Sequence, residues 1–198
     1  MLSIKGGMRP DRTPDGTPEG VRRSVENCVK ILEGKKKIDI FECARVDRDT
    51  PIETTIAALA EMVEEGKVGG VSLSEVSADT IRRAAKVHKI CAVEVEVSLF
   101  QDHVLKEGIA DACAENDIPI IAYSPVGRGF LTGQFKSTKD IPEGDLRHMF
   151  PRFRPEVSAQ LFYEPHLLSH TSSMTISDKQ NHVVHAVVQM LCSSSAYA

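Results

Sequence analysis

The stretch IKGGMRPDRTPDG (residues 4–16) decides between the two α/β architectures that the rest of the sequence allows. It follows the first predicted strand, LSI (2–4), where an open doubly wound sheet would carry a glycine-rich phosphate loop. Here the GxGxxG spacing is missing, and no helix follows at once. The stretch therefore favours part of an eight-stranded β/α barrel over an open sheet.

Around this stretch, as far as Pro125, short apolar runs alternate with helical patterns, which is typical of βαβ units and a parallel sheet. Thr17 and Pro18 provide a cap and a first-turn proline for the first helix. Thr50 and Glu53 have the spacing of a capping box for the second, and Ser77 caps the third. The predicted strands are LSI (2–4), KIDIFECA (37–44), GGVSLSE (69–75), CAVEVEVSLF (91–100) and IPIIAYS (118–124); the predicted helices run from Thr17 to Gly34, from Thr50 to Gly66, from Ala78 to about His88, and through Val104, Ile109, Ala112 and Cys113.

One predicted strand carries charge in an alternating pattern. In CAVEVEVSLF (91–100) the valines alternate with Glu94, Glu96 and Ser98. In a parallel sheet covered by helices, a period of two sends these polar side chains into the barrel lumen or to its end. Carboxylates in such a position need partners.

Composition excludes several classes of function. The chain has 198 residues, 41% of them apolar, with a net charge of -4 and a pI near 6.0, which is typical of a globular domain without a nucleic-acid-binding stripe. No apolar run is long enough for a membrane span and no secretory signal is visible, so we expect a cytoplasmic protein. Five cysteines without CxxC spacing indicate reduced thiols, and the histidines at 166, 170, 182 and 185 lack an HExxH pattern, so we expect no metal.

The character of the sequence changes after Phe135. Residues 136–156, KSTKDIPEGDLRHMFPRFRPE, form a charged loop that suits either a cover over an active-site mouth or a solvated insertion. We expect residues 157–198 to be a divergent, poorly ordered tail without βα continuation. The predicted organisation is thus an incomplete barrel over residues 1–156, with about five βα units, and an irregular tail.

Several long motifs, in this order, resemble the aldo-keto reductases, and the fungal pyridoxal reductases most closely. They are LSIKGG, IDIFECARVD with PIETT after it, GGVSLSEVSADTIRRA, AVEVEVSLF and IIAYSPVGRGFLTGQF, and they cover about residues 2–155. The resemblance implies a (β/α)8 TIM barrel that uses NADPH to reduce a small-molecule aldehyde, here pyridoxal, to the alcohol. The resemblance leaves the oligomeric state open; from charge and apolar-run length we expect no nucleic-acid or membrane partner.

The resemblance also implies roles for residues. Lys5 falls on the family's catalytic lysine, which lowers the pKa of a proton-donating tyrosine. The family's aspartate and tyrosine lie upstream of this lysine, before the start of this sequence. Ala44 stands at the family's histidine position, so Phe41, Ala44 and Arg45 are weak substrate-contact candidates.

The cofactor positions match the family better. Ser74 and Glu75 match the pair that meets the nicotinamide carboxamide, and Glu94 stands where many relatives have glutamine. Tyr123 matches the position that stacks on the nicotinamide. The loop that approaches the pyrophosphate is matched by Ser124, Pro125, Val126, Gly127 and Arg128.

Three interpretations remain open. The first is an aldo-keto reductase truncated by roughly two strands in front and one behind, judged against an eight-unit barrel, with little or no turnover. The second is an inactive fragment that binds a nucleotide or pairs with another chain through its open sheet edge. The third is an incomplete gene model whose real product is a full reductase.

Overall fold

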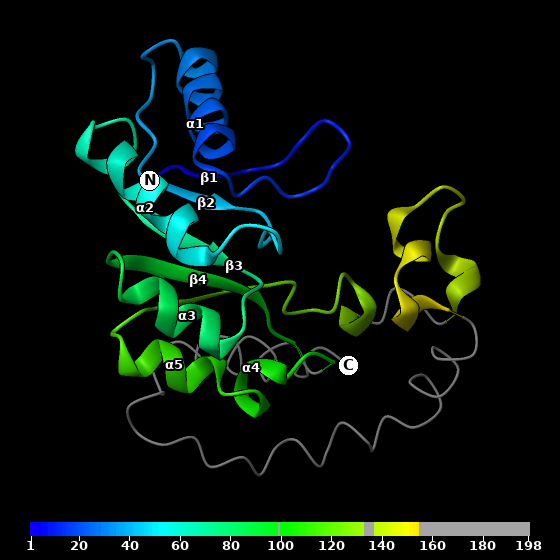
Figure 1. Ribbon diagram of the computed structural model, residues 1–198. Helices are drawn as coiled ribbons and strands as arrows, with labels where there is room; N and C mark the ends of the chain where they lie inside the picture. Colours follow the sequence, from blue (N-terminus) through cyan, green and yellow to red (C-terminus); the bar gives the residue numbers. More distant parts are fainter. Residues whose placement is uncertain (99, 133–136, 155–198) are drawn as a thin grey trace. The chain divides into compact units, whose positions relative to one another are not determined.

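The computed structural model describes residues 1–98, 100–132 and 137–154 (Figure 1). The chain divides into two compact units. The first comprises Met1–Glu96 and His103–Tyr123, and the second comprises Val97–Asp102 and the chain from Ser124 onward. The predicted tail, 157–198, lies outside the described residues. None of the helices in the described ranges is long and apolar enough to cross a membrane.

The first unit contains a parallel sheet in which every strand pairs with the next one along the chain. The strands are β1 (Ser3–Gly6), β2 (Ile40–Cys43), β3 (Val71–Ser74), β4 (Ile90–Glu96) and β5 (Ile120–Tyr123), in the order β1-β2-β3-β4-β5. An open doubly wound sheet reverses its strand order at a switch point, whereas a β/α barrel does not. The sequential order therefore confirms the predicted barrel type, which periodicity alone had left undecided.

The helices form a layer that follows the same order. They are α1 (Pro18–Leu32), α2 (Ile52–Glu64), α3 (Ala78–Ala85), α4 (His103–Lys106) and α5 (Ile109–Glu115). Helix α1 packs against α2, α2 against α3, and α3 against α5 (Figure 1). Successive helices that touch one another cover the same side of the sheet, which is the arrangement of a barrel wall.

The core of the first unit lies between the sheet and this helix layer. Its fully buried side chains include Val21, Val25, Phe41, Ile56, Leu59, Met62, Val71, Ile81 and Val93. Each such side chain contributes about 1.5–3 kcal/mol through the apolar surface that it removes from water. The opposite face of the strands carries Lys5, Glu42, Ser72, Ser74 and Glu94, which build the site described below.

Two of the three predicted helix caps are confirmed. The hydroxyl of Thr17 accepts a hydrogen bond from the Gly20 N–H, and that of Ser77 accepts one from the Thr80 N–H. The capping box of Thr50 and Glu53 is wrong.

At the start of α2 the N-cap is Pro51, without a side-chain cap. Thr50 Oγ1 instead donates to Asp47 Oδ2 at 2.9 Å. Glu53 accepts from the Arg83 guanidinium at 2.7 Å. Local spacing predicted the capping box, but the Thr50 side chain binds Asp47 in the preceding loop and the Glu53 side chain binds Arg83 on α3.

Several element boundaries also differ from the sequence prediction, most of all in the third and fourth predicted helices and the fourth strand. The helix predicted through Val104 and Cys113 is broken into α4 and α5 at Gly108, whose φ of 72° is left-handed and cannot continue a helix. Helix α3 ends at Ala85, three residues short of the predicted His88. Strand β4 ends at Glu96, since Ser98 and Gln101 bond to each other across a turn.

The second unit has an apolar centre of its own. Four short 3-10 helices occupy Phe130–Thr132, Thr138–Asp140, Leu146–Met149 and Pro151–Phe153. Phe130, Ile141 and Phe153 are buried together, and the ring of Phe130 stands edge-on to those of Phe100 and Phe153, with centroids 5.1 and 5.7 Å away. The segment predicted as a charged loop is thus organised around aromatic side chains.

Candidate active site

A charged cluster lies at the carboxyl edge of the sheet, on the face away from the helices. Lys5 on β1 places its Nζ 2.7 Å from Glu42 Oε1 and 3.2 Å from Glu94 Oε1. The same Nζ donates to Ser74 Oγ at 2.7 Å. One hydrogen bond and two ion pairs therefore surround the Lys5 ammonium.

Sheet register explains why these side chains meet. Lys5 pairs with Glu42 across β1 and β2, and Ser74 pairs with Glu94 across β3 and β4. Side chains that alternate along parallel strands bring such neighbours to the same face. The sequence prediction that Glu94 needs a partner is answered by Lys5.

Glu42 is the member of the cluster that sequence reasoning missed. Its side chain is 1% exposed, and its Oε2 accepts a hydrogen bond from Ser72 Oγ at 2.7 Å. Burial raises the pKa of Glu42, although Lys5 and Ser72 act to lower it. The missed signal was an acid between Phe41 and Cys43 in a strand, where alternation places the acid opposite the core-facing side chains.

A second group of contacts joins the ends of β3, β4 and β5. Glu75 has a left-handed φ of 53°, and its N–H donates to the Glu94 carbonyl. Its Oε1 accepts from the Glu96 N–H at 2.9 Å, and its carboxylate also binds the Tyr123 hydroxyl. Left-handed backbone at a non-glycine residue costs about 1–2 kcal/mol, and such residues are frequent at functional sites.

Tyr123 is held in an environment that favours its neutral form. Burial, followed by the hydrogen bond and negative charge of Glu75, raises the pKa of Tyr123 to about 12. Its hydroxyl is therefore a poor source of a proton at neutral pH. This placement leaves its ring, rather than its hydroxyl, as the part available for binding.

The weak substrate candidates on β2 and after it lie in different places. Arg45 is exposed and donates to the Ala44 carbonyl at 2.6 Å. Its charge acts on Tyr123, so it lies at the same edge of the sheet. Phe41 is fully buried below Gly6 and Ser24, on the core side, which does not favour a contact with substrate.

The predicted pyrophosphate loop, from Ser124 to Arg128, belongs to the second unit. Ser124, Gly127 and Arg128 all have left-handed φ values, and the Gly127 N–H donates to the Ser124 carbonyl at 2.9 Å. Tight turns of this kind are able to present N–H groups to anions. The Arg128 guanidinium lies 4.0 Å from the centroid of the Phe150 ring, in a cation–π contact.

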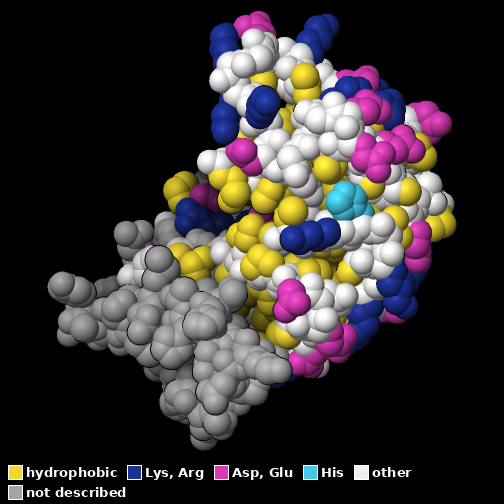
Figure 2. All heavy atoms as spheres, turned by 90° about the vertical axis from the view of Figure 1, so that its left-hand side faces the viewer, with side chains coloured by type: hydrophobic (Ala, Val, Ile, Leu, Met, Phe, Trp, Pro, Cys, Tyr) yellow, Lys and Arg dark blue, Asp and Glu magenta, His cyan; other side chains and the backbone are white. Residues whose placement is uncertain are grey.

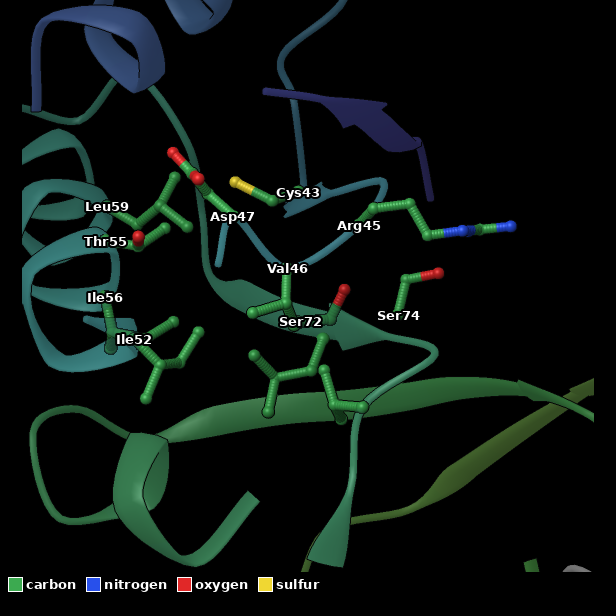
Figure 3. A pocket seen from close by; sticks show the side chains of 12 residues that line it. Cys43, Arg45, Val46, Asp47, Ile52, Thr55, Ile56, Leu59, Ser72 and Ser74 are labelled. Atoms are coloured by element: carbon green, nitrogen blue, oxygen red, sulfur yellow. The ribbon is translucent and has the colours of Figure 1, made fainter. Parts of the chain in front are cut away.

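A pocket lies under the loop that follows β2, between α2 and the end of β3 (Figure 3). Two of its polar residues hold neighbouring chain: Asp47 Oδ2 accepts from the Gly16 N–H at 2.9 Å, and Thr55 Oγ1 donates to the Gly16 carbonyl at 2.7 Å. A side chain at Gly16 would collide with both. The remaining lining is largely apolar, from Ile52, Ile56 and Leu59. At Asp47 and Thr55 the pocket belongs to the packing of the β1–α1 loop. Ser72 and Ser74, which bind Glu42 and Lys5 of the charged cluster, line it as well.

The described cysteines are free thiols, and the described residues hold no metal cluster. Burial raises the pKa of Cys43 to about 12 and that of Cys113 to about 11, which suppresses thiolate chemistry. No group of three or more His, Cys, Asp and Glu within the described ranges is arranged to bind a metal ion. Cys192 and the histidines from 166 to 185 lie outside those ranges.

Sequence comparison matches most of the chain to one family. The profile described as "Aldo/keto reductase family" matches residues 1–183. Over 163 residues, 79% of this chain, the sequence is 46% identical to "Probable pyridoxal reductase 2" of Schizosaccharomyces pombe, of which it covers 48%. It is 48% identical over 121 residues to the aldo-keto reductase yakc of the same yeast, whose name carries NADP(+), covering 60% of this chain and 36% of that protein. The chain thus spans at most about half the length of these relatives.

Structure comparison points to the same architecture. The glycerol dehydrogenase of Gluconobacter oxydans superimposes with a TM-score of 0.72 over 97% of this chain and 59% of that one. The two sequences are 20% identical, so the likeness concerns the fold alone. It agrees with the sequential strand order.

Proposed function

Because this chain belongs to the aldo/keto reductase family, we propose that its carboxyl-edge site serves the NADPH-dependent reduction of pyridoxal or another small aldehyde to the alcohol. The observation that carries the proposal is the Lys5 ammonium, fixed at the carboxyl end of β1 by Glu42, Ser74 and Glu94. In β/α barrels this end of the strands carries the active site. The relatives named as a pyridoxal reductase and as NADP(+)-using support the choice of substrate and cofactor.

The residues at this edge fit the nicotinamide end of the cofactor in part. Tyr123 offers a half-buried ring whose orientation is fixed through its hydroxyl by Glu75. Glu94 keeps 22% of its side chain exposed and can accept from a carboxamide. Ser74 fits less well because it is buried and its Oγ already accepts from Lys5.

The chemistry requires positive charge near the carbonyl oxygen. NADPH, when bound, supplies the hydride that reaches the carbonyl carbon. Lys5 supplies the fixed positive charge that favours the developing oxyanion, and the alkoxide that forms takes its proton from water. Tyr123 does not suit the donor role, because Glu75 holds its hydroxyl and its pKa is about 12.

The test combines binding and turnover on the purified 198-residue chain. NADPH is titrated by fluorescence, and its oxidation is then followed with and without pyridoxal. We expect saturable binding, pyridoxal-dependent oxidation, and loss of the oxidation in Lys5→Met with binding changed by less than about twofold, since Lys5 acts on the oxyanion. The low turnover expected from the sequence is measured in the same assay. Absence of saturable NADPH binding would contradict the proposal.

One observation favours a second candidate function, nucleotide binding without turnover. Glu42, Ser74 and Glu94 already surround the Lys5 ammonium, so a substrate would have to displace one of them. Saturable NADPH binding with no pyridoxal-dependent oxidation would support this alternative.

A further inference from the structure

The buried carboxylate of Glu42 has no place in the sequence-based assignment of the site. A carboxylate that is 1% exposed is costly to keep ionised unless a cation and hydrogen bonds compensate for the lost water. Here the cation is Lys5, 2.7 Å from Oε1, and the hydrogen bond comes from Ser72, 2.7 Å from Oε2. Both oxygens are therefore tied to neighbouring strands.

The two ends of the Lys5–Glu42 contact differ in freedom. The lysine has four flexible methylene groups and a side chain that is 37% exposed, so its ammonium has room to move toward solvent. The carboxylate is enclosed, hydrogen-bonded by Ser72, and set opposite Lys5 by the β1–β2 register. The enclosed Glu42 carboxylate therefore determines the position of the more mobile Lys5 ammonium.

Glu94 is the weaker of the two acidic partners. Its Oε1 lies 3.2 Å from Lys5 Nζ, compared with 2.7 Å for Glu42, and 22% of its side chain is exposed. The attraction within an ion pair is stronger when the charges are closer and less water screens them. Glu94 therefore remains able to meet a ligand while Glu42 retains the ammonium.

We propose that Glu42 is the positioning residue that holds the Lys5 ammonium at the carboxyl edge of the sheet. The catalytic consequence of this proposal rests on the proposed function. The positioning itself does not, because it is a property of the chain without ligand. The charged groups that face Glu42 are Lys5 and Glu94, and the neutral donor is Ser72. Replacement by glutamine keeps the shape of the side chain but removes the charge that retains the ammonium.

Amine labelling tests the positioning directly. The full chain is treated with a limiting amount of acetic anhydride, and acetylation of Lys5 is quantified by mass spectrometry relative to Lys67. The reference is suitable because Lys67 is held by Glu26 at 2.6 Å and by Glu65 at 2.9 Å, on the outer surface. We expect Glu42→Gln to raise the labelling of Lys5 about tenfold, the change that corresponds to about 1.4 kcal/mol, and to leave Lys67 unchanged.

Matched variants separate positioning from general damage. Glu94→Gln should raise Lys5 labelling less than Glu42→Gln does, and Glu42→Asp should restore part of the protection. If Glu42→Gln unfolds the chain, labelling of Lys67 rises as well. In that case Ser72→Ala replaces it as the test variant, because it frees the Glu42 carboxylate without changing its charge. Ser72→Ala should raise the labelling of Lys5 alone. Unchanged Lys5 labelling in both Glu42→Gln and Ser72→Ala would overturn the proposal.

The catalytic consequence has its own readout. In the pyridoxal assay Glu42→Gln should lower kcat while leaving NADPH binding within about twofold, because the ammonium is misplaced and the cofactor contacts remain. Labelling that responds as expected in a chain without turnover would leave the positioning role standing and remove the proposed reduction. Turnover without any labelling response would support the proposed reduction and remove the positioning role of Glu42.

Discussion

Two groups of ion pairs among the described residues use the same kinds of side chain for different ends. On the outer helix layer Arg22 pairs with Glu61 and Glu65, and Arg83 with Glu53, all substantially exposed. Figure 2 shows acidic and basic side chains beside one another on the surface of the described part. On the inner face, Lys5, Glu42 and Glu94 form one cluster with an enclosed carboxylate.

The pKa shifts in the two regions have opposite signs. Arg83 lowers the pKa of Glu53 to about 2, because water still solvates both ionised groups. Burial raises the pKa of Glu42 even though Lys5 is equally close. Both pairs are 2.7 Å apart, so solvent access makes the difference between Glu53 and Glu42. At the enclosed Asp15 the outcome differs again, because hydrogen bonds from Thr17 and Arg23 outweigh burial and lower its pKa.

The largest effect should come from removing the inner cation. Loss of one partner from a fully buried pair costs roughly 3–5 kcal/mol, and because Lys5 is more than one third exposed we expect about 2 kcal/mol for Lys5→Met. Denaturant unfolding at neutral pH measures the loss in free energy of unfolding. An unchanged unfolding midpoint would show that the Lys5–Glu42 pair contributes no more to stability than the exposed pairs of the outer helix layer.

The next largest effect should be a pH dependence of the free energy of unfolding that comes from Glu42. The folded chain binds the Glu42 proton more tightly than the unfolded chain does, so wild-type stability falls as pH rises from about 4.5 through the raised pKa. Glu42→Gln does not titrate at this position. The advantage of wild type over the variant should therefore shrink across this window and stay constant above it; an advantage that grows with pH would be the opposite result.

Salt should separate the two regions by a smaller effect. At 1 M ionic strength the screening length is about 3 Å, which weakens exposed pairs far more than enclosed ones. NMR titration should show the pKa of Glu53 moving up toward its ordinary value while the pKa of Glu42 stays nearly constant. Equal pKa changes at Glu53 and Glu42 would contradict the division into an outer and an inner region.

The smallest effect is expected from Arg83→Gln. Glu53 has a lowered pKa, so its contribution is present above about pH 4.5 and is lost as the pH falls toward about 2. Both groups are exposed, and unfolding at neutral pH should change by less than in Lys5→Met. Acid unfolding curves should differ less between Arg83→Gln and wild type than the neutral-pH curves do.

Local patterns predicted most of the first unit. Alternating and helical periods located the five strands and the helices between them, and Thr17 and Ser77 cap as predicted. Predictions failed where partners came from elsewhere in the chain, as when Asp47 took the Thr50 hydroxyl. The left-handed Gly108 also gave no signal distinct from an ordinary helical glycine.

The site was predicted less completely than the fold. Motif resemblance identified Lys5, Ser74 and Glu94, and the structure brings these three together. It missed Glu42, because its role depends on a register between segments that are 37 residues apart and on burial that a sequence does not display. The assigned roles in binding and catalysis stay predictions.

Deuterium transfer tests the central claim most directly, that this carboxyl edge is a reductase site organised by Lys5. The chain is incubated with pyridoxal and NADPH deuterated at its transferable position, and the product alcohol is examined by mass spectrometry. The account predicts one deuterium on the former aldehyde carbon, and no such product with Lys5→Met. A wild-type chain that binds NADPH but yields no deuterated alcohol, or a Lys5→Met chain that yields as much as wild type, would contradict it.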